Sequence, residues 1–371
     1  MGIIVDLFAG PGGWSEGLRM LDPNLHAQEI GIEWDKAACA TRAAAGHTTI
    51  QADIAQFPVE QFAGKTVGLI ASPPCQDFSM AGKRAGIEGE RGQLVTEVLR
   101  WTEALNPEWV VCEQVPPVLP IWKEFAEQME SWGYSTWVGI LNAADYGVPQ
   151  IRKRAFLLAS QVGPVAVPEP SHAKNPEPSL FGPTLQPWVT MADALGWGRP
   201  KPSWTLCAGV HGAPDPFLSG GSGVRANLRE EISRGEWKMN TGRAWKKGGT
   251  REDAQSVPST SPAPSVTGQA GAWWMVRPST TIVGSFRPMI VAGPGVDLTR
   301  PRQELEGSVR ITPEDALVLQ SFPVDYPVQG SVTKQFEQIG NAVPPLLAAH
   351  VLGAVTGSRY GCGTSEHNPP R

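Results

Sequence analysis

The first 159 residues alternate short apolar runs with amphipathic segments, and this alternation restricts the fold more than any other feature of the chain. Short apolar runs indicate buried strands, and the segments between them have the spacing of helices. Strands that alternate with helices form βαβ units, so we predict an α/β fold with a doubly wound, mostly parallel sheet. We expect strands at 2–8, 28–33, 67–71, 109–113, 136–141 and 155–159, and helices at 14–21, 36–45, 94–105 and 122–132.

The alternation stops near Gly163, and the chain then changes in composition and charge. Residues 160–307 are rich in the turn-formers Gly and Pro and lack a regular apolar period. Residues 1–159 are net negative and residues 160–300 net positive, within a whole-chain charge of −5. Helical periodicity returns at 312–319 and 344–355. We therefore predict a first domain (1–159), a second, partly basic domain (160–307), a C-terminal segment (308–356) and a flexible tail (357–371).

The cysteine count and the apolar runs indicate the environment of the protein. Five cysteines, odd in number and without a CxxC pair, fit neither a disulfide framework nor a structural zinc site. No apolar run reaches the roughly 18 residues of a membrane span, and the first residues do not resemble a signal peptide. We expect a soluble, cytoplasmic protein that binds no metal.

A glycine-rich turn, Asp6 to Gly13 (DLFAGPGG), joins the first strand to the first helix. Glycines there let the backbone approach a ligand at the carboxyl edge of a parallel sheet, although a purely structural turn would use the same residues. Glu33 and Trp34 end the next strand, and Asp53 follows the one after it. Glu33, an acid at the end of the second strand, suits a ribose diol, and the indole of Trp34 offers an aromatic face for a base. The alternative is a helix-capping acid beside a core tryptophan.

Cys75 lies in a Ser-Pro-Pro-Cys-Gln segment after the strand at 67–71. The prolines stiffen the loop that presents the thiol, and a thiol is a strong nucleophile, although a lone cysteine is more often a small buried residue. Glu113 ends the following strand on the same edge, near that loop. Further along, the alternation of a strand places Arg152 and Arg154 on one face, unless they are simply a solvated charge run.

Taken in order, these segments resemble the motifs of the cytosine carbon-5 DNA methyltransferases of bacterial or phage restriction-modification systems. The likeness continues in QDFS (76–79), GK (82–83), RGQL (91–94), RITPEDA through Gln320 (310–320) and QIGNAVPP (338–345). It covers residues 1–159 and about 308–356. One departure is visible, because Gln114 stands where the family usually has Asn. We expect the longer amide to loosen the packing of the loop and to affect the rate more than the type of reaction.

The resemblance implies a Rossmann-like fold with an inserted, loop-rich target-recognition domain at 160–307, and methyl transfer to carbon 5 of a flipped-out cytosine. It implies that Cys75 attacks carbon 6, that Glu113 binds ring nitrogen 3 and the amine, that Arg154 contacts the base carbonyl and that Arg152 supports the thiol loop. Gln76, Ser79 and Gln150 are the implied substrate-binding residues. The residues implied for S-adenosyl-L-methionine are Phe8, Gly10, Gly12, Gly13, Glu33, Trp34, Asp53, Ile54, Pro74, Leu94 and Asn341.

The implied partners are double-stranded DNA and a separate restriction endonuclease, with the enzyme itself a monomer away from membranes. Two other readings of the motifs stay open. The substrate would be RNA in the transfer-RNA branch of the fold, but that branch has a shorter middle region. A catalytically inactive DNA-binding protein would use the same scaffold, but Cys75, Glu113, Arg152 and Arg154 are all present.

Overall fold

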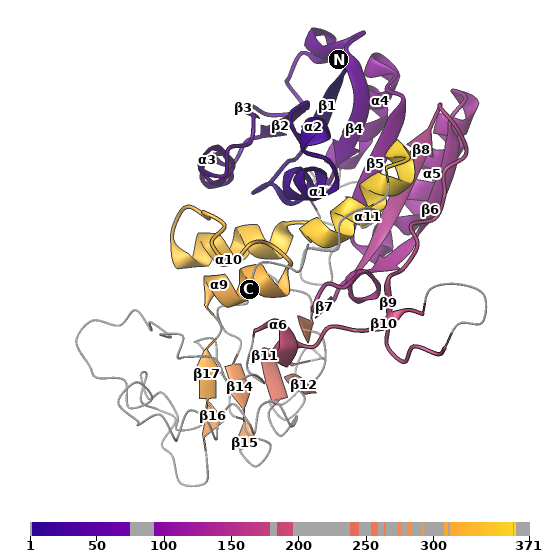
Figure 1. The fold of residues 1–371 in the computed structure, drawn as a ribbon. Helices are drawn as coiled ribbons and strands as arrows, with labels where there is room; N and C mark the ends of the chain where they lie inside the picture. The colour runs from indigo at the N-terminus through magenta and orange to yellow at the C-terminus, as the bar shows by residue number, and fades with distance from the viewer. Residues whose placement is uncertain are drawn as a thin grey trace.

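The computed structural model describes residues 2–74, 93–178, 184–195, 312–358 and Tyr360, together with the backbone of short strands between 238 and 310 (Figure 1). Seven strands form the central sheet in the order β3-β2-β1-β4-β5-β8-β6. Strands β1 to β5 are parallel, and β8 runs antiparallel to both of its neighbours. The prediction of an α/β fold with a mostly parallel sheet is therefore confirmed. The strands are β1 (Ile3–Leu7), β2 (Glu29–Glu33), β3 (Thr49–Gln51), β4 (Thr66–Ala71), β5 (Trp109–Gln114), β6 (Ser135–Asn142) and β8 (Lys153–Ser160).

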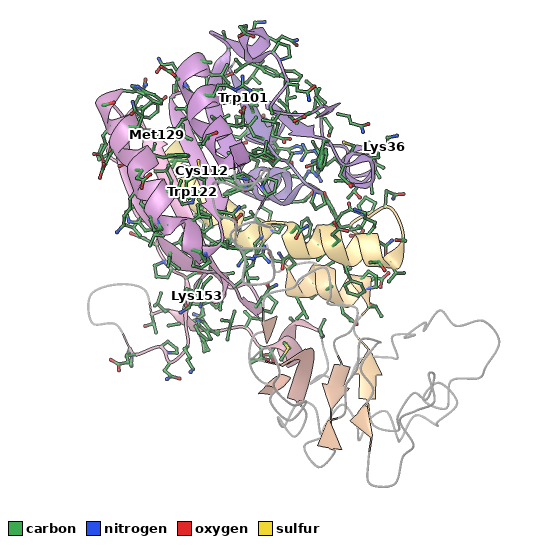
Figure 2. All side chains as sticks on the ribbon, turned by 180° about the vertical axis from the view of Figure 1, so that it is seen from behind. Lys36, Trp101, Cys112, Trp122, Met129 and Lys153 are labelled. Carbon is green, nitrogen blue, oxygen red and sulfur yellow. The ribbon has the colours of Figure 1, made fainter. Side chains whose placement is uncertain are left out.

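Helices cover both faces of the sheet, which explains why its central strands are apolar along their length. Helices α4 and α5 pack on one face, where Trp101, Trp122 and Met129 belong to the same buried cluster as Cys112 of β5 (Figure 2). Helices α1 and α11 pack on the other face. The helices, with short 3₁₀ turns, are α1 (Gly13–Leu21), α2 (Pro23–His26), α3 (Lys36–Ala44), η1 (Val59–Phe62), η3 (Gln93–Thr96), α4 (Glu97–Leu105), η4 (Pro116–Val118), α5 (Leu119–Ser131), η5 (Ala143–Tyr146), α6 (Met191–Ala194), α9 (Pro313–Leu319), α10 (Val332–Asn341) and α11 (Pro345–Thr356).

The last described helix, α11, packs against the first helix, α1, so a segment from late in the chain lies on the sheet formed by its beginning (Figure 1). Gly17 permits the close approach of α1 and α11, because a Cβ atom there would lie 2.5 Å from the Cβ atom of Ala348. Leu18 of α1 and Leu347 of α11 are both fully buried in the cluster that this contact creates. The C-terminal segment is thus a structural part of the first domain.

Among the described residues, one segment, Val332–Thr356, has the length and apolar composition of a membrane span. It consists of two helices, α10 and α11, separated at Ala342 to Pro344. Within the protein, 67% of the apolar window is buried. The apolar side chains of this segment therefore contribute to the interior of the fold.

The region predicted as turn-rich contains short strands. A four-stranded antiparallel sheet has the order β12-β11-β14-β17, and β13 pairs with β7 next to the first domain. Residues 225–251, which hold eight Lys and Arg against three acids, contribute β11, and the other residues of this stretch lie outside the described part. The domain boundaries stay predictions. The strands are β7 (Gln150–Ile151), β9 (His172–Ala173), β10 (Gln186–Pro187), β11 (Lys238–Ala244), β12 (Ala254–Pro258), β13 (Ala263–Pro264), β14 (Trp274–Val276), β15 (Thr281–Ile282), β16 (Val291–Ala292) and β17 (Ser308–Arg310).

Candidate active site

The polar residues singled out in the sequence gather at the carboxyl edge of the sheet. The strand order reverses between β1 and β4, and ligands of open α/β sheets bind in the crevice beside such a switch point. The glycine-rich turn follows β1, Glu33 is the last residue of β2, Pro73 follows β4, and Glu113 lies near the end of β5. The fold therefore brings one element of each motif to the same edge.

The glycine-rich turn has an unusual backbone and little free space. Phe8, Gly10 and Gly12 have positive φ angles of 59°, 54° and 105°. A positive φ is uncommon for a phenylalanine, and such strain is concentrated at functional sites. A Cβ atom on Gly13 would lie 2.2 Å from the carbonyl oxygen of Val343. The turn is therefore packed directly against the C-terminal segment.

Glu33 is held by the backbone on both sides of its carboxylate. Its Oε2 accepts the N–H of Gly10 at 2.8 Å, and its Oε1 accepts the N–H groups of Trp34 and Asp35 at 2.9 and 2.8 Å. The cap of α3 is Asp35, which accepts the N–H groups of its first turn. Trp34 is 66% exposed. Neither half of the alternative, a capping Glu33 beside a core Trp34, describes this structure.

These groups fit an adenosine-type cofactor. A carboxylate that is already oriented suits the two hydroxyls of a ribose, and an exposed indole offers a face on which an adenine can stack. Three hydrogen bonds hold Glu33 in place before any ligand binds. The glycine turn adds a backbone that a ligand can approach closely.

The other residues expected near the cofactor lie on neighbouring segments. Asp53 is exposed and its carboxylate bonds within its own turn, whereas Ile54 is only 4% exposed and its carbonyl accepts from Arg100 at 2.9 Å. Pro74 and Leu94 are half-buried, and Asn341 is exposed at the end of α10. Their contacts with a cofactor stay predictions.

A buried ion pair joins the two candidate catalytic groups Glu113 and Arg154. The Nε atom of Arg154 lies 2.9 Å from Oε1 of Glu113, and the two side chains are 15% and 7% exposed. Glu113 is opposite Phe156 in the β5–β8 pairing, and Arg154 is two residues from Phe156 on the same face. Among the described residues no donor is aligned for a hydrogen bond to that carboxylate oxygen. The carboxylate is therefore paired in charge and still able to accept from a ligand.

Arg152 and Gln150 both contact the C-terminal segment. The strand is interrupted at Arg152, between β7 and β8, and its Nη1 donates to the carbonyl of Gly340 at 2.9 Å. Gln150 is fully buried and donates to Gln320 at 2.5 Å and to the carbonyl of Leu319 at 3.2 Å. Arg152 and Arg154 thus contact different partners. The substrate contact expected of Gln150 stays a prediction, and its observed hydrogen bonds connect two parts of the chain.

Gln114 ties the loop after β4 to the end of β5. Its Nε2 donates to the carbonyl of Pro73 at 2.6 Å, and its Oε1 accepts the N–H of Val115 at 2.6 Å. The side chain is 2% exposed. The longer amide therefore makes two short hydrogen bonds at the start of the thiol loop, where we expected looser packing. Cys75, Gln76 and Ser79 lie outside the described residues.

Sequence reasoning missed a buried ionic cluster beside the glycine turn. Arg42 lies 2.7 Å from Glu29 and 3.9 Å from Asp6, and all three side chains are buried. Burial, with the nearby Glu29, raises the pKa of Asp6 well above its usual value, and Arg42 opposes this only in part. Gly31 leaves room for the guanidinium, because a Cβ atom there would lie 2.1 Å from Arg42 Nη2. Two acids within apolar strands are the only sequence signal of this cluster.

The sheet order and the polar groups at its switch point define a Rossmann-like α/β enzyme. The sequence model of the C-5 cytosine-specific DNA methylases matches residues 3–356, so the chain belongs to that family. The protein is a DNA (cytosine-5)-methyltransferase, and a covalent cysteine adduct is the mechanism of the family. Methyltransferases generally use S-adenosyl-L-methionine. The family expected from the sequence is confirmed.

Individual relatives agree with this assignment. The chain is 28% identical to type II methyltransferase M1.HphI of Haemophilus parahaemolyticus over 95% of this chain and 86% of the relative. It is 32% identical to M.AquIA of Picosynechococcus over 52% of this chain and 87% of the relative. Dnmt2 of S. pombe has a TM-score of 0.57 at 15% identity, with 96% and 99% of the two chains covered. The Entamoeba histolytica methyltransferase EhMeth also scores 0.57, at 14% identity, with 95% and 98% covered. At such low identity these two structures support the fold alone.

Proposed function

We propose that this methyltransferase modifies a cytosine within a specific site of double-stranded DNA, with S-adenosyl-L-methionine held at the ends of β1 and β2 and the base held at the ends of β4 and β5. The observation that carries the proposal is the buried Glu113–Arg154 pair, which Gln114 connects to the loop preceding Cys75. A buried, charge-paired carboxylate next to a proline-stiffened thiol loop suits covalent activation of a base.

The target base is stacked inside the duplex, so it first has to flip out, which costs a few kcal/mol. The Cys75 thiolate then forms a bond to carbon 6, and the electron pair of the 5,6 double bond moves so that carbon 5 becomes nucleophilic. S-adenosyl-L-methionine, when bound, would supply the methyl group that carbon 5 takes, with S-adenosyl-L-homocysteine as the leaving group. Loss of the proton from carbon 5 restores the double bond and expels the thiolate.

Glu113 reads and stabilises the base in this scheme. One carboxyl oxygen accepts from the exocyclic amine of cytosine, and the other shares a proton with ring nitrogen 3, which itself carries no hydrogen; thymine presents the opposite donor and acceptor pattern on that edge. Burial at 6% exposure makes each such bond stronger than it would be in water. Arg154 holds the carboxyl and contacts the base carbonyl, and Arg152 supports the neighbouring backbone from the side of Gly340.

Glu33 is the residue proposed to hold the ribose of the cofactor, and Trp34 and Phe8 lie beside the adenine. The glycines of the turn lie near the methionine portion. The remaining proposed contacts are Asp53, Ile54, Pro74, Leu94 and Asn341. The pre-ordered carboxylate of Glu33 supports this arrangement, because no reorganisation is needed when the ribose binds.

The insertion at 160–307 is proposed to recognise the target sequence. Its net positive charge suits contacts with phosphates, which provide most sequence-independent affinity, and side chains from its loops would read base edges in the major groove. We propose that the enzyme acts as a monomer beside a separate restriction endonuclease. A sizing experiment with and without duplex DNA checks the monomer.

Two variants and a control test the catalytic assignment. Cys75→Ala is expected to abolish methyl transfer while cofactor affinity is retained, and Glu113→Gln to lower the rate about 10²- to 10⁴-fold. Glu127→Gln, the same change on the exposed side of α5, should have no effect.

Expression in a host without cytosine methylation, followed by bisulfite sequencing, gives the target site. Full activity of Cys75→Ala, or a host genome without any methylated motif, would contradict the proposal.

A further inference from the structure

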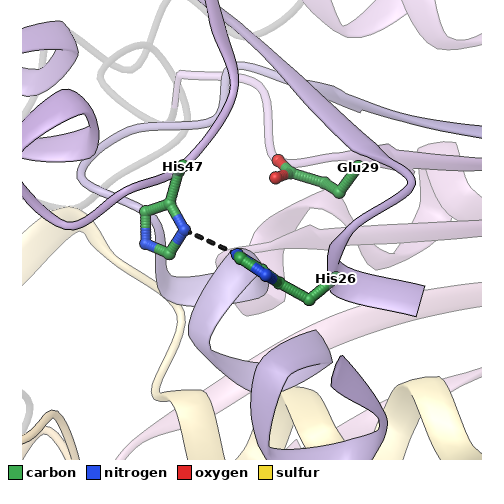
Figure 3. A group of neighbouring side chains, drawn as sticks. All are labelled: His26, Glu29 and His47. Atoms are coloured by element: carbon green, nitrogen blue, oxygen red, sulfur yellow. Dashed lines mark hydrogen bonds between the residues drawn. The ribbon is translucent and has the colours of Figure 1, made fainter. Parts of the chain in front are cut away.

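A chain of hydrogen bonds connects the surface near α2 to the glycine-rich turn. The Nε2 of His26 lies 2.9 Å from Nδ1 of His47, as Figure 3 shows, and Nε2 of His47 lies 3.0 Å from the hydroxyl of Tyr326. The Tyr326 hydroxyl donates to the carbonyl oxygen of Pro11. His47 and Tyr326 are only 5% and 6% exposed. The chain therefore ends, inside the protein, on the backbone of the turn proposed to bind the cofactor.

The acceptors in this chain determine where each proton lies. A carbonyl oxygen only accepts, so the Tyr326 hydroxyl gives its proton to Pro11, and burial keeps that proton in place by raising the pKa of Tyr326. His47 Nε2 must then carry a hydrogen, which its distance of 3.2 Å from the Glu16 carboxylate also favours. The Nδ1 atom of His47 lies 2.9 Å from Nε2 of His26 and 3.3 Å from Nη2 of Arg19. Burial and the adjacent Arg19 lower the pKa of His26 to about 4, so the His26 ring is neutral at neutral pH.

The hydroxyl fixes one peptide plane of the turn. The carbonyl of Pro11 bonds to Tyr326, and the N–H of the same peptide, on Gly12, bonds to the carbonyl of Ala9 at 3.2 Å. A Cβ atom on Gly12 would lie 2.7 Å from the Tyr326 hydroxyl, so the contact also explains the glycine. The Ala9–Gly10 peptide, at the start of the turn, is fixed separately, because the N–H of Gly10 donates to Glu33. Tyr326 and Glu33 therefore hold the turn from opposite ends.

We propose that Tyr326, oriented by His47 and His26, is a positioning residue for S-adenosyl-L-methionine: it keeps the Pro11–Gly12 peptide in the conformation that binds the cofactor. This inference rests on the proposed cofactor site at the same turn. Without the hydroxyl, only the 3.2 Å bond from the Gly12 N–H to the Ala9 carbonyl holds this peptide plane in the unliganded protein, and binding then has to restore its orientation. Cofactor affinity falls as a result, whereas the catalytic step at Cys75 is unaffected once the cofactor is bound.

A bound metal ion is the competing explanation of the histidine pair. One ligand atom from each of His26, Glu29 and His47 lies within 4.8 Å of the others. However, the Nη2 atom of Arg19 lies 3.4 Å from the ring nitrogen of His26 and 3.3 Å from that of His47. A guanidinium at this place repels a cation, and a metal would break the bond between the rings. The hydrogen-bonded chain is therefore the better account.

Two other tyrosines of the protein serve as matched controls for the test. Tyr134 and Tyr146 are also buried, and their hydroxyls also donate to proline carbonyls, those of Pro107 at 2.7 Å and Pro168 at 2.9 Å. Both contacts lie away from the glycine turn. Tyr326→Phe, Tyr134→Phe and Tyr146→Phe each remove one buried bond to a proline carbonyl, and Tyr326→Phe also removes the bond from His47, so it should lose the most stability of the three. Only Tyr326→Phe should change cofactor binding.

The measurement is calorimetric titration of each purified full-length variant with S-adenosyl-L-methionine, beside a thermal melt. We expect Tyr326→Phe to weaken binding about tenfold, the worth of one hydrogen bond, and the controls to bind as the wild type does. His47→Gln, which keeps an N–H near the tyrosine, should bind within about twofold of the wild type, whereas His47→Leu should match Tyr326→Phe. In steady-state assays the loss should appear in KM for the cofactor and leave kcat unchanged.

The outcomes separate the two proposals. A wild-type protein that does not bind S-adenosyl-L-methionine overturns the proposed function, and this inference with it. Equal affinities of wild type and Tyr326→Phe overturn the inference alone. A higher melting temperature of the wild type in Zn²⁺, absent in His26→Ala, would show a metal site in place of the hydrogen-bonded chain and would also overturn the inference.

Discussion

Replacing Gln114 by asparagine, the residue usual in the family, should impair this enzyme. Gln114 bonds the carbonyl of Pro73 and the N–H of Val115, both at 2.6 Å. Asparagine is shorter by one C–C bond, roughly 1.5 Å. A bond of 2.6 Å lengthened by most of that distance exceeds the range of a hydrogen bond, and rotation of the side chain can restore one of the two contacts only. The Pro73 carbonyl and the Val115 N–H thus lie where a glutamine side chain reaches both and an asparagine side chain reaches only one.

The expected change in the free energy of unfolding follows from the lost hydrogen bond and the lost methylene group. A buried group left without its partner costs about 1–3 kcal/mol, and the missing methylene removes about 0.8 kcal/mol of burial. Gln114→Asn should therefore lower the free energy of unfolding by about 2–4 kcal/mol. If the loop carrying Cys75 moves by even 1 Å, the methylation rate should fall by up to about 100-fold, because covalent attack depends on the position of the thiol.

Urea unfolding measures the first effect and single-turnover methyl transfer the second. DNA containing 5-fluorocytosine in the target site adds a direct readout, because fluorine does not leave as a proton does and the covalent adduct persists. Gln114→Glu is the matched variant: its length is unchanged and it still accepts from Val115, but an oxygen faces the carbonyl of Pro73. It should be nearly as slow as Gln114→Asn. Wild-type stability and adduct formation in both variants would refute the reasoning.

Three further predictions concern the first domain. Gly13→Ala places a Cβ atom against the backbone of Val343 and should lower the free energy of unfolding, measured in urea, by about 1–3 kcal/mol or more. Gly64→Ala is the control: the site lies in open space at a φ of +68°, and the loss should be about 1 kcal/mol or less. Trp34→Ala should weaken cofactor binding in a calorimetric titration about 5- to 100-fold with little change in stability, because the exposed indole contributes only stacking. Asp6 has a raised pKa when folded, so it favours folding at low pH, and this contribution falls as pH rises above the usual value of 3.8. Asp6→Asn should flatten that part of the stability–pH curve, and an unchanged slope would contradict the assignment.

The sheet and the order of motifs could be predicted because each depends on local sequence. The apolar run at 66–71 and the proline pair after it identify a buried strand and the loop that follows it without any knowledge of the partner strands. Helix α10 was not predicted, although Val332, Phe336 and Ile339 have the spacing of one helix face; only Phe336 and Ile339 of these are buried, and the segment is otherwise polar. The antiparallel insertion of β8 between β5 and β6 depends on pairing, which periodicity does not specify.

In the candidate site, the residues at strand ends could be predicted and their partners could not. Glu113 and Arg154 were each identified from the sequence, but their ion pair depends on the register of two strands. Tyr326 lies more than 300 residues from Pro11 along the chain, and no local pattern marks it. In the sequence Arg42 looks like an ordinary charged residue of a helix, because its acidic partners lie on neighbouring strands that only the fold brings close to it. Contacts between distant segments carry no signal in a single sequence.

The packing of α11 on α1 has a consequence for biosynthesis. The apolar face of α1 includes Trp14 and Leu18, and it is covered by a helix that the ribosome makes more than 300 residues later. At about 5–20 residues per second, this surface stays uncovered for roughly 15–60 s. A nascent chain of this enzyme is therefore unable to complete its catalytic fold during most of its translation. A product truncated before α11 would leave the apolar face of α1 exposed and prone to aggregation. Cells making this protein should depend on chaperones during that interval.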